Sequence, residues 1–243
     1  MIASPGGKFE MPIVLTATII PNQVAAVASN PKTRLAEYLA SLKFYLQFAP
    51  VIFLENSGYP LERHPEFAET ARLRVKKFAP SANPERGKGY QEFEMLDAWL
   101  SAEPQPPARW LKISGRYRME NIQDILRECS GDLRDELIID QILRSGAART
   151  YQFCVTTAFY QRQIAGAYLE CDDRNGNWIE RVLFRKFKTA PEKISSFKTQ
   201  PLVLATSGGD GRAFPKGWLQ WRVKQTLRSL NRLADKKYLW YSR

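Results

Sequence analysis

The chain has 243 residues, of which 44% are hydrophobic and 12% aromatic, and its formal net charge is +11. A chain of this composition can bury a core, which excludes an intrinsically disordered protein. The longest uncharged apolar run, MPIVLTATIIP, is about half of the ~20 residues that a membrane-spanning helix needs, so no transmembrane segment is predicted.

The sequence also limits the compartment and the partners. Its first ten residues, MIASPGGKFE, lack the basic segment and apolar run of a secretory signal. Cys129, Cys154 and Cys171 are odd in number and lack CxxC spacing, which argues against disulfides and a zinc site. We therefore expect a cytoplasmic protein. Its positive charge is compatible with nucleic acid, an anionic membrane surface or a phosphorylated substrate as partner.

In the first half of the chain, apolar runs alternate with segments of helical periodicity. Residues 12–20, PIVLTATII, form the continuous β-branched run that is typical of a buried parallel strand. Residues 60–72 are predicted to be helical or irregular. The predicted strands include residues 13–19, 50–55, 73–80 and 109–113, and the predicted helices are residues 30–48 and 91–102.

This alternation predicts an α/β fold with a mainly parallel sheet covered by helices. The strands end in PNQ, ENSG and SGRY, and ligands of open α/β sheets bind at the carboxyl ends of the strands. Lys112 and Arg116 should therefore lie at the ligand edge of the sheet. The alternative is that Lys112 is solvated and that Arg116 caps a helix or pairs with Glu120.

The second half is less regular. Residues 150–161 are predicted to be a strand that runs into a helix. Residues 168–187 are predicted to contain a strand, a turn at Asn175-Gly176 and a helix with Glu180. Residues 206–217, TSGGDGRAFPKG, are the best candidate for a linker, and they set an amphipathic C-terminal helix apart.

Two common kinds of catalytic site are not supported by the motifs. His64 is the one histidine of the chain, so every Ser-His or Cys-His relay would depend on it. No GxxxxGK[ST] phosphate loop occurs. The GKG at residues 87–89 is either an ordinary turn or a helix start where Lys88 and backbone amides hold an anion.

Five segments together carry a family resemblance: IVLTATIIP, R..EYLASLKFY, VIFLENSGYPLE, GKGYQEFEMLDAW and WLKISGRYRMEN. In this order they resemble bacterial surface-polysaccharide glycosyltransferases of GT-A-like type, over roughly residues 12–185. The most specific parts are GKGY.E and K.SGRY...N. The resemblance implies a Rossmann-type domain that binds a nucleotide-sugar donor across its first strands and an acceptor glycan, free or lipid-linked, with its second half.

The expected organisation is a catalytic domain over residues 1–205, followed by a basic amphipathic helix over residues 212–243. The donor half spans about residues 1–130 and the acceptor half about residues 131–205. The expected donor-binding residues are Thr16, Arg34, Glu55, Asn56, Ser57, Lys88, Gly89, Glu92, Lys112, Ser114, Gly115, Tyr117 and Asn121.

The sequence departs from the GT-A pattern because it contains no Asp-x-Asp, the motif that holds a divalent cation on the donor diphosphate. The nearest substitute, Glu170-Cys171-Asp172, lies far downstream. Fixed Lys and Arg groups can also stabilise a diphosphate leaving group. We therefore expect neither a divalent metal nor a cofactor, and we assign the stabilising role to Lys112 and Arg116.

Catalysis with inversion needs a base for the acceptor hydroxyl. The candidates are Glu180, Asp172 and Asp173, of which Glu180 and Asp173 join Arg116 as the expected catalytic residues. For Glu180 the alternative role is a favourable interaction with the helix dipole. Glu55 and Asn56 could equally close the strand through an Asx turn. Arg34 lies at a helix start, where a cation is disfavoured unless a ligand is bound nearby.

The leading hypothesis is a metal-independent glycosyltransferase of capsule, lipopolysaccharide or exopolysaccharide assembly. One alternative is a nucleic-acid-binding protein, but no RNP motif, zinc finger or recognition helix is evident, so nucleic acid is not expected as a partner. Another is a nucleotidyltransferase, for which a two-metal carboxylate pair is not evident.

The C-terminal helix suggests a location at the membrane. Residues 212–243 contain nine Lys or Arg residues and one acidic residue, Asp235. A peripheral position on the inner face of the cytoplasmic membrane is one interpretation, and packing of the apolar stripe on the domain is the other. The stripe comprises Leu219, Val223, Leu227, Leu230 and Ala234, the basic flank Lys224, Arg228 and Arg232, and the flanking tryptophans Trp218, Trp221 and Trp240.

Overall fold

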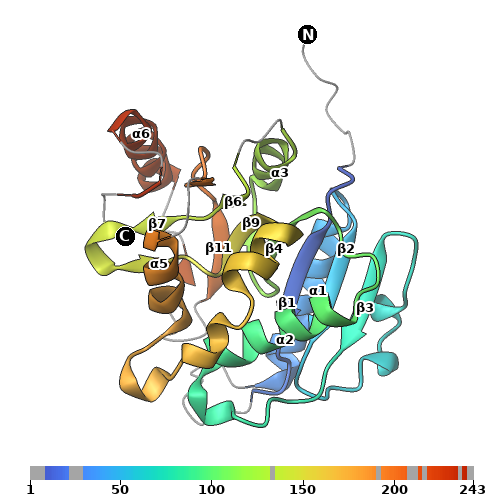
Figure 1. Cartoon of the computed structure of the whole chain (residues 1–243). Helices are drawn as coiled ribbons and strands as arrows, with labels where there is room; N and C mark the ends of the chain where they lie inside the picture. The colour runs from blue at the N-terminus through green and yellow to red at the C-terminus, as the bar shows by residue number, and fades with distance from the viewer. Residues whose placement is uncertain are drawn as a thin grey trace.

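The computed structural model describes residues 9–21, 30–131, 135–189, 193–206, 213–214, 218–234 and 237–239. Its centre is a seven-stranded sheet in the order β3-β2-β1-β4-β9-β6-β10 (Figure 1). The strands are β1 (Ile13–Ala17), β2 (Val51–Glu55), β3 (Leu73–Lys77), β4 (Arg109–Ser114), β6 (Leu137–Ile138), β9 (Gln152–Thr156) and β10 (Ile194–Ser195).

The direction of the strands confirms the predicted mainly parallel sheet. Neighbours β3, β2, β1 and β4 pair in parallel, as do β6 and β10. β9 runs antiparallel to both β4 and β6. The start of β9 therefore lies at the same edge of the sheet as the carboxyl end of β4, where Ile113 pairs with Gln152.

The central strands are largely apolar because helices cover both faces of the sheet. Val14 and Trp110 pack on one face with residues of α2 (Lys88–Ala102) and α5 (Ile179–Thr189). Ile13 and Leu111 pack on the other face with residues of α1 (Pro31–Tyr45) and α3 (Ile122–Ser130). Side chains of a strand alternate between the faces, so each strand needs apolar residues at consecutive positions.

One predicted element of secondary structure needs correction, and two others are confirmed. The strand predicted at the start of residues 168–187 is wrong, because Ala167–Glu170 form a 3₁₀ turn after Gly166, whose φ is +76°. Residues 60–72 hold two 3₁₀ turns, Leu61–Arg63 and Pro65–Phe67. The strand predicted to run into a helix is confirmed, since β9 continues into a short α-helical turn, α4 (Thr157–Phe159), and a π-helical turn.

Smaller elements complete the fold. β5 (Arg118–Met119), β11 (Val203–Thr206) and β12 (Ala213–Phe214) form a three-stranded sheet, and β7 (Gln141–Ile142) pairs with β8 (Ala147–Ala148). The expected linker, residues 206–217, lies mostly outside the described residues. Among the described residues, no helix combines the length and the apolar composition that crossing a bilayer requires.

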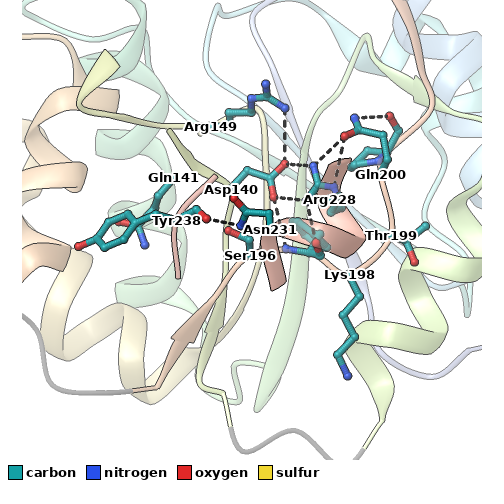
Figure 2. A network of polar contacts seen from close by, with 12 residues as sticks. Asp140, Gln141, Arg149, Ser196, Lys198, Thr199, Gln200, Arg228, Asn231 and Tyr238 are labelled. Carbon is teal, nitrogen blue, oxygen red and sulfur yellow. Dashed lines mark hydrogen bonds and ion pairs between the residues drawn. The ribbon is translucent and has the colours of Figure 1, made fainter. Parts of the chain in front are cut away.

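Helix α6 (Trp218–Ala234) is bound to the rest of the protein through its polar side (Figure 2). Arg228 is fully buried, and its guanidinium lies 2.7 Å from the carboxylate of Asp140, which is also fully buried. Trp221 Nε1 donates to the carbonyl of Gln200 at 2.8 Å. Arg228 therefore does not belong to an exposed basic flank, which corrects the prediction.

Three residues of the predicted apolar stripe of α6 face solvent instead of the domain. Leu219, Val223 and Leu230 are 71%, 53% and 52% exposed. At 100° per residue these three positions lie opposite Arg228 on the helix. These three residues therefore do not pack on the domain, whereas Leu227 of the same stripe is half-buried. The side chains of Trp218, Arg232 and Ala234, and all of Trp240, lie outside the described part of the chain.

Candidate functional site

A cavity of about 310 Å³ opens at the carboxyl ends of β1 and β4, beside the start of α2. This is the edge at which the sequence predicted ligand binding. Ten of the predicted site residues line this cleft, namely Thr16, Arg34, Lys88, Gly89, Glu92, Ser114, Gly115, Arg116, Tyr117 and Glu180. The other lining residues are Ala17, Thr18, Pro21, Tyr38, Gln91, Met95, Thr150, Tyr151 and Ile179.

Three cations meet in the cleft. Burial lowers the pKa of Lys88, and the positive charges of Arg34 and Arg116 lower it further, while Asp173 opposes them. Arg116 Nη1 lies 2.8 Å from Glu37 Oε2. Arg34 donates from Nε to the carbonyl of Thr18 at 2.9 Å. Arg34 is buried, whereas Lys88 keeps an exposed side chain. Mutual repulsion of these neighbouring cations favours an anion between them, because an anion offsets the repulsion.

Two carboxyl groups, those of Glu92 and Glu180, face the same cleft. Thr150 Oγ1 donates to Glu180 Oε1 at 3.0 Å. Burial raises the pKa of Glu180; the hydrogen bond from Thr150 lowers it, and the nearby charges of Glu92 and Asp173 raise it. Glu180 lies in the first turn of α5, as the sequence predicted. A buried carboxyl group with a raised pKa, exposed to a ligand cleft, has the properties of a general acid or base.

Lys112 lies beneath the cleft, which corrects the expectation that it faces the ligand. Its side chain is fully buried, and Nζ lies 2.6 Å from Glu92 Oε1. The ammonium also donates to the carbonyl of Thr150 at 2.8 Å and to Ser114 Oγ at 3.2 Å. The solvated alternative is wrong for the same reason. In β4, Lys112 lies on the same face as Trp110, and α2 covers that face and supplies Glu92.

The start of α2 is occupied by a carboxylate of the protein itself. Asp173 accepts a hydrogen bond from the backbone N–H of Lys88, while burial raises its pKa. Gly87 precedes the helix with a φ of +113°, and a Cβ at this position would lie 2.0 Å from Asp173 Cγ. Asp173 therefore caps α2 instead of lining the cleft, and the amide of Lys88 is engaged without a ligand.

Glu55, Asn56 and Ser57 brace the loop that follows β1 and do not line the cleft. Glu55 Oε1 accepts from the amides of Ile19 at 3.2 Å and Ser57 at 2.9 Å. Asn56 accepts from Thr18 Oγ1 at 2.6 Å. These three residues support the wall of the cleft.

Asn121 is also a supporting residue. Its amide group donates to the carbonyl of Gln200 at 3.0 Å and accepts from the N–H of Leu202 at 2.8 Å.

Gly115 allows a close approach of two chain segments in the cleft. A Cβ at Gly115 would lie 2.8 Å from the carbonyl oxygen of Thr16 and 3.1 Å from the ring of Tyr38. Gly115 N also donates to that carbonyl at 2.9 Å. Any residue larger than glycine at position 115 would displace Thr16 where the ends of β1 and β4 meet.

Sequence reasoning missed Thr18, Tyr38, Thr150 and Tyr151. Tyr38 lies one helical turn after Arg34, a spacing that would have placed both on the same side of α1. Thr150 and Tyr151 precede β9, and their position follows only once β9 is known to run antiparallel to β4.

The described residues contain no group of three or more His, Cys, Asp or Glu side chains that could hold a metal ion. Glu170 and Asp172, the nearest substitute for an Asp-x-Asp, are engaged separately. Glu170 lies 3.0 Å from Lys186, whereas Asp172 lies 3.1 Å from Arg174.

Comparisons with known proteins show the fold class. No protein-family model and no curated sequence matches the chain. Among solved structures, the inositol-1-phosphate CTP transferase from T. maritima is similar, with a TM-score of 0.50 and 12% identity over 79% of this chain and 86% of that chain. At this identity the likeness shows the fold alone, a Rossmann-like α/β domain of GT-A type, as predicted.

Two further solved structures are similar at lower scores. HddC from Yersinia pseudotuberculosis has a TM-score of 0.46 and 10% identity over 80% of this chain and 93% of its own. Mouse xyloside xylosyltransferase 1 has a TM-score of 0.45 and 9% identity over 78% of this chain and 85% of its own.

The buried pair under the cleft gives a stability prediction. Lys112→Met should lower the free energy of unfolding by about 3 kcal/mol at neutral pH, because it leaves Glu92 without its cation in a largely buried place. Adding Glu92→Gln should recover part of the loss, which urea unfolding of a double-mutant cycle would measure.

The control is the exposed ion pair of Lys43 and Glu66. Lys43→Met should change the free energy of unfolding by about 0.5 kcal/mol or less. A loss in Lys112→Met no larger than in this control would show that Lys112 does not hold the cleft together.

Proposed function

We propose that the protein is a glycosyltransferase, which moves a sugar from a nucleotide-sugar donor to a growing surface glycan. The observation that carries this proposal is the meeting of three cations (Arg34, Lys88, Arg116) and two carboxyl groups (Glu92, Glu180) in one cleft at the carboxyl edge of the sheet. The motif resemblance to polysaccharide enzymes supports the surface glycan as acceptor.

The cations suit the donor diphosphate. When the bond from the anomeric carbon to the diphosphate oxygen breaks, its electron pair stays on that oxygen, and the negative charge of the leaving nucleotide grows. Arg116 and Lys88 can bind that charge, with Arg34 close enough to add to the potential. This arrangement supports a reaction that needs no divalent metal. Thr16, Gly89, Ser114, Gly115 and Tyr117 supply the remaining donor surface.

Glu180 is the proposed base. In a transfer with inversion, the acceptor hydroxyl attacks the anomeric carbon and gives its proton to a carboxylate. Glu180 lines the cleft and is oriented by Thr150, so its carboxylate can receive that proton. Asp173 is directed to the start of α2 instead, and we assign it a supporting role.

Nucleotidyl transfer is the second candidate, because the CTP transferase from T. maritima has a similar fold. The two reactions release different products from nucleotide substrates. Sugar transfer or slow hydrolysis of a nucleotide-sugar releases a nucleoside diphosphate, whereas nucleotidyl transfer from a nucleoside triphosphate releases pyrophosphate.

A screen of nucleotide-sugars and of nucleoside triphosphates with sugar phosphates separates these candidates. We expect nucleoside diphosphate from one nucleotide-sugar and no pyrophosphate from any triphosphate. Pyrophosphate release alone would replace the proposal with nucleotidyl transfer. Salt-sensitive retention on DNA without either product would favour a nucleic-acid-binding protein.

Glu180→Gln should abolish transfer without lowering stability at pH 7. Burial raises the pKa of Glu180 above that of an ordinary glutamate, which is ~4.3. The active carboxylate therefore forms at a higher pH than in an ordinary glutamate. The acid limb of kcat should lie above that value in the wild type. Because the folded pKa is raised, the contribution of Glu180 to stability is present at low pH and lost as pH rises through that pKa.

Glutamine stays neutral and avoids this loss, so the Tm of Glu180→Gln at pH 7 should equal or exceed that of the wild type. Full transfer activity in Glu180→Gln would remove Glu180 from the mechanism.

Arg116→Ala should lower turnover roughly 10²-fold, the usual effect of removing one group that stabilises charge in a transition state. Its unfolding free energy should change by about 1 kcal/mol or less, since the paired Glu37 side chain is 33% exposed. Arg127→Ala, which removes a surface arginine paired with Asp124, is the matched control. Equal turnover in the two variants would contradict the role of Arg116.

Transfer should persist in EDTA, because the cleft offers fixed cations for the leaving diphosphate. The measurement is the initial rate of donor turnover before and after dialysis against EDTA. Loss of activity that Mn²⁺ or Mg²⁺ restores would show that a metal stabilises the leaving group. Glu170 and Asp172 would then be the first ligands to test.

We also propose that α6 holds the enzyme on the inner face of the cytoplasmic membrane, where a lipid-linked acceptor would lie. The outward face of α6 carries Leu219, Val223 and Leu230, and Arg222 lies exposed beside them. Residues 212–243 carry nine cations and one acid, and of these cations the buried Arg228 does not contribute to the membrane-facing charge. Anionic lipid attracts each nearby cation by ~1 kcal/mol, and exposed leucines favour the acyl boundary.

Vesicle sedimentation tests this location. The full chain should bind vesicles that contain phosphatidylglycerol, bind neutral vesicles less, and dissociate as salt is raised. Leu219→Gln combined with Leu230→Gln should reduce binding. The matched control is Leu169→Gln, since Leu169 is 58% exposed on a different element.

Point variants are preferable to deletion after Gly211, because deletion would remove the partner of the buried Asp140. Equal sedimentation of the double variant and the wild type would contradict membrane binding by this face of α6.

A further inference from the structure

A single buried carboxylate connects α6 to the loop before β9 (Figure 2). Asp140 follows β6, and both of its carboxylate oxygens accept from Arg228, at 2.7 Å and 2.8 Å. Arg228 Nη1 also donates to the carbonyl of Phe197 at 2.7 Å. Burial by itself raises the pKa of Asp140, but the guanidinium of Arg228 outweighs this effect and holds the pKa below its usual value.

The same aspartate holds the loop that leads to the cleft. The backbone carbonyl of Asp140 accepts from the N–H of Arg149 at 2.7 Å. Its carboxylate Oδ2 lies 3.5 Å from Arg149 Nη1. Figure 2 shows Arg149 and Arg228 on either side of Asp140. The main chain and the side chain of Arg149 are thus both directed by one residue, which is itself fixed by α6.

The next residue, Thr150, reaches two charged groups of the site. Its hydroxyl donates to Glu180 Oε1 at 3.0 Å, and its carbonyl accepts from Lys112 Nζ at 2.8 Å. One peptide bond therefore separates the Asp140 contact from the hydrogen bond that orients the proposed base.

We propose that Arg228 is a positioning residue for Glu180, acting from α6 through Asp140, Arg149 and Thr150. This inference rests on the proposed role of Glu180 as base and names what regulates its proton affinity. If the pair of Arg228 and Asp140 is broken, Asp140 retains the N–H of Phe197 and one cation, Arg149, which then moves toward it. The hydroxyl of Thr150 moves with Arg149, and its hydrogen bond to Glu180 is lost.

The groups that face Glu180 determine the direction in which its pKa shifts when the hydrogen bond from Thr150 is lost. Glu92 from α2 and Asp173 from the turn before α5 favour its protonated form. Lys112 from β4 interacts with its charge, and Cys171 is a neutral thiol, whose pKa burial raises to about 12. The hydrogen bond from Thr150 stabilises the carboxylate, so its loss shifts the titration of Glu180 to higher pH.

The experiment measures this titration directly. Full-length protein labelled with ¹³C at glutamate side-chain carboxyls is titrated by NMR, and Glu180→Gln assigns the signal. The test variants are Arg228→Met, Arg228→Lys and Arg149→Met. Arg149→Met leaves the buried pair of Arg228 and Asp140 intact, so it reports even if Arg228→Met does not fold. Trp221→Phe is the control, because it removes a hydrogen bond of α6 that does not involve Asp140.

We expect the Glu180 midpoint to rise in Arg149→Met and Arg228→Met, to rise less in Arg228→Lys, and to stay unchanged in Trp221→Phe. The acid limb of kcat should move in the same direction, with kcat about tenfold lower below the limb and KM for the donor unchanged. Thr150→Val should reproduce the rise, whereas Thr150→Ser should not.

A wild-type midpoint in both Arg149→Met and Arg228→Lys would overturn the inference. An equal rise in Trp221→Phe would also overturn it, because α6 would then act only as a general clamp. The NMR titration needs no turnover, so failure to find any transfer activity would count against the proposed function and leave this test intact.

Discussion

The buried ammonium of Lys112 holds the cleft in shape. It draws together α2 through Glu92, the end of β4 through Ser114 and the loop before β9 through Thr150. A cation removed from water must be surrounded by acceptors, because an unpaired buried charge is strongly destabilising. The three segments must therefore keep the arrangement in which all three acceptors reach the ammonium of Lys112. In this arrangement Glu92 and Glu180 lie on the wall of the cleft.

The cleft holds charges of both signs, and its cations are held by groups other than the proposed base, Glu180. Arg116 is paired with Glu37 and Arg34 with the carbonyl of Thr18, so both guanidinium groups are held by neighbours at the edge of the site. Glu180 is held by a neutral hydroxyl group. Under the proposed function, these cations bind the anionic leaving group while the carboxyl group of Glu180 stays separate from it and removes the proton.

Much of the fold could be predicted from local patterns. The apolar runs of β1, β2 and β4 and the helical periodicity of α1 and α2 are contained within each segment, and the alternation of these elements predicts the parallel sheet. Strand ends were sufficient to place Thr16, Ser114, Gly115 and Arg116 at one edge.

The position of Lys112 could not be predicted in the same way. In an alternating strand, Lys112 must lie on the face opposite Leu111 and Ile113. The sequence does not show that α2 covers that face and supplies Glu92. Thr150 depends on the antiparallel direction of β9. Arg228 looked like a surface cation in the helical pattern, because its partner Asp140 is 88 residues away in the sequence.

That separation has a consequence for the order in which the protein folds during synthesis. A ribosome that adds roughly 5–20 residues per second needs about 4–18 s to make the segment from Asp140 to Arg228. During that time the loop before β9 has been made, and it contains Arg149, which also contacts Asp140 in the complete fold. Asp140 can therefore contact Arg149 before Arg228 has been made, and in the complete fold the two arginines share its carboxylate.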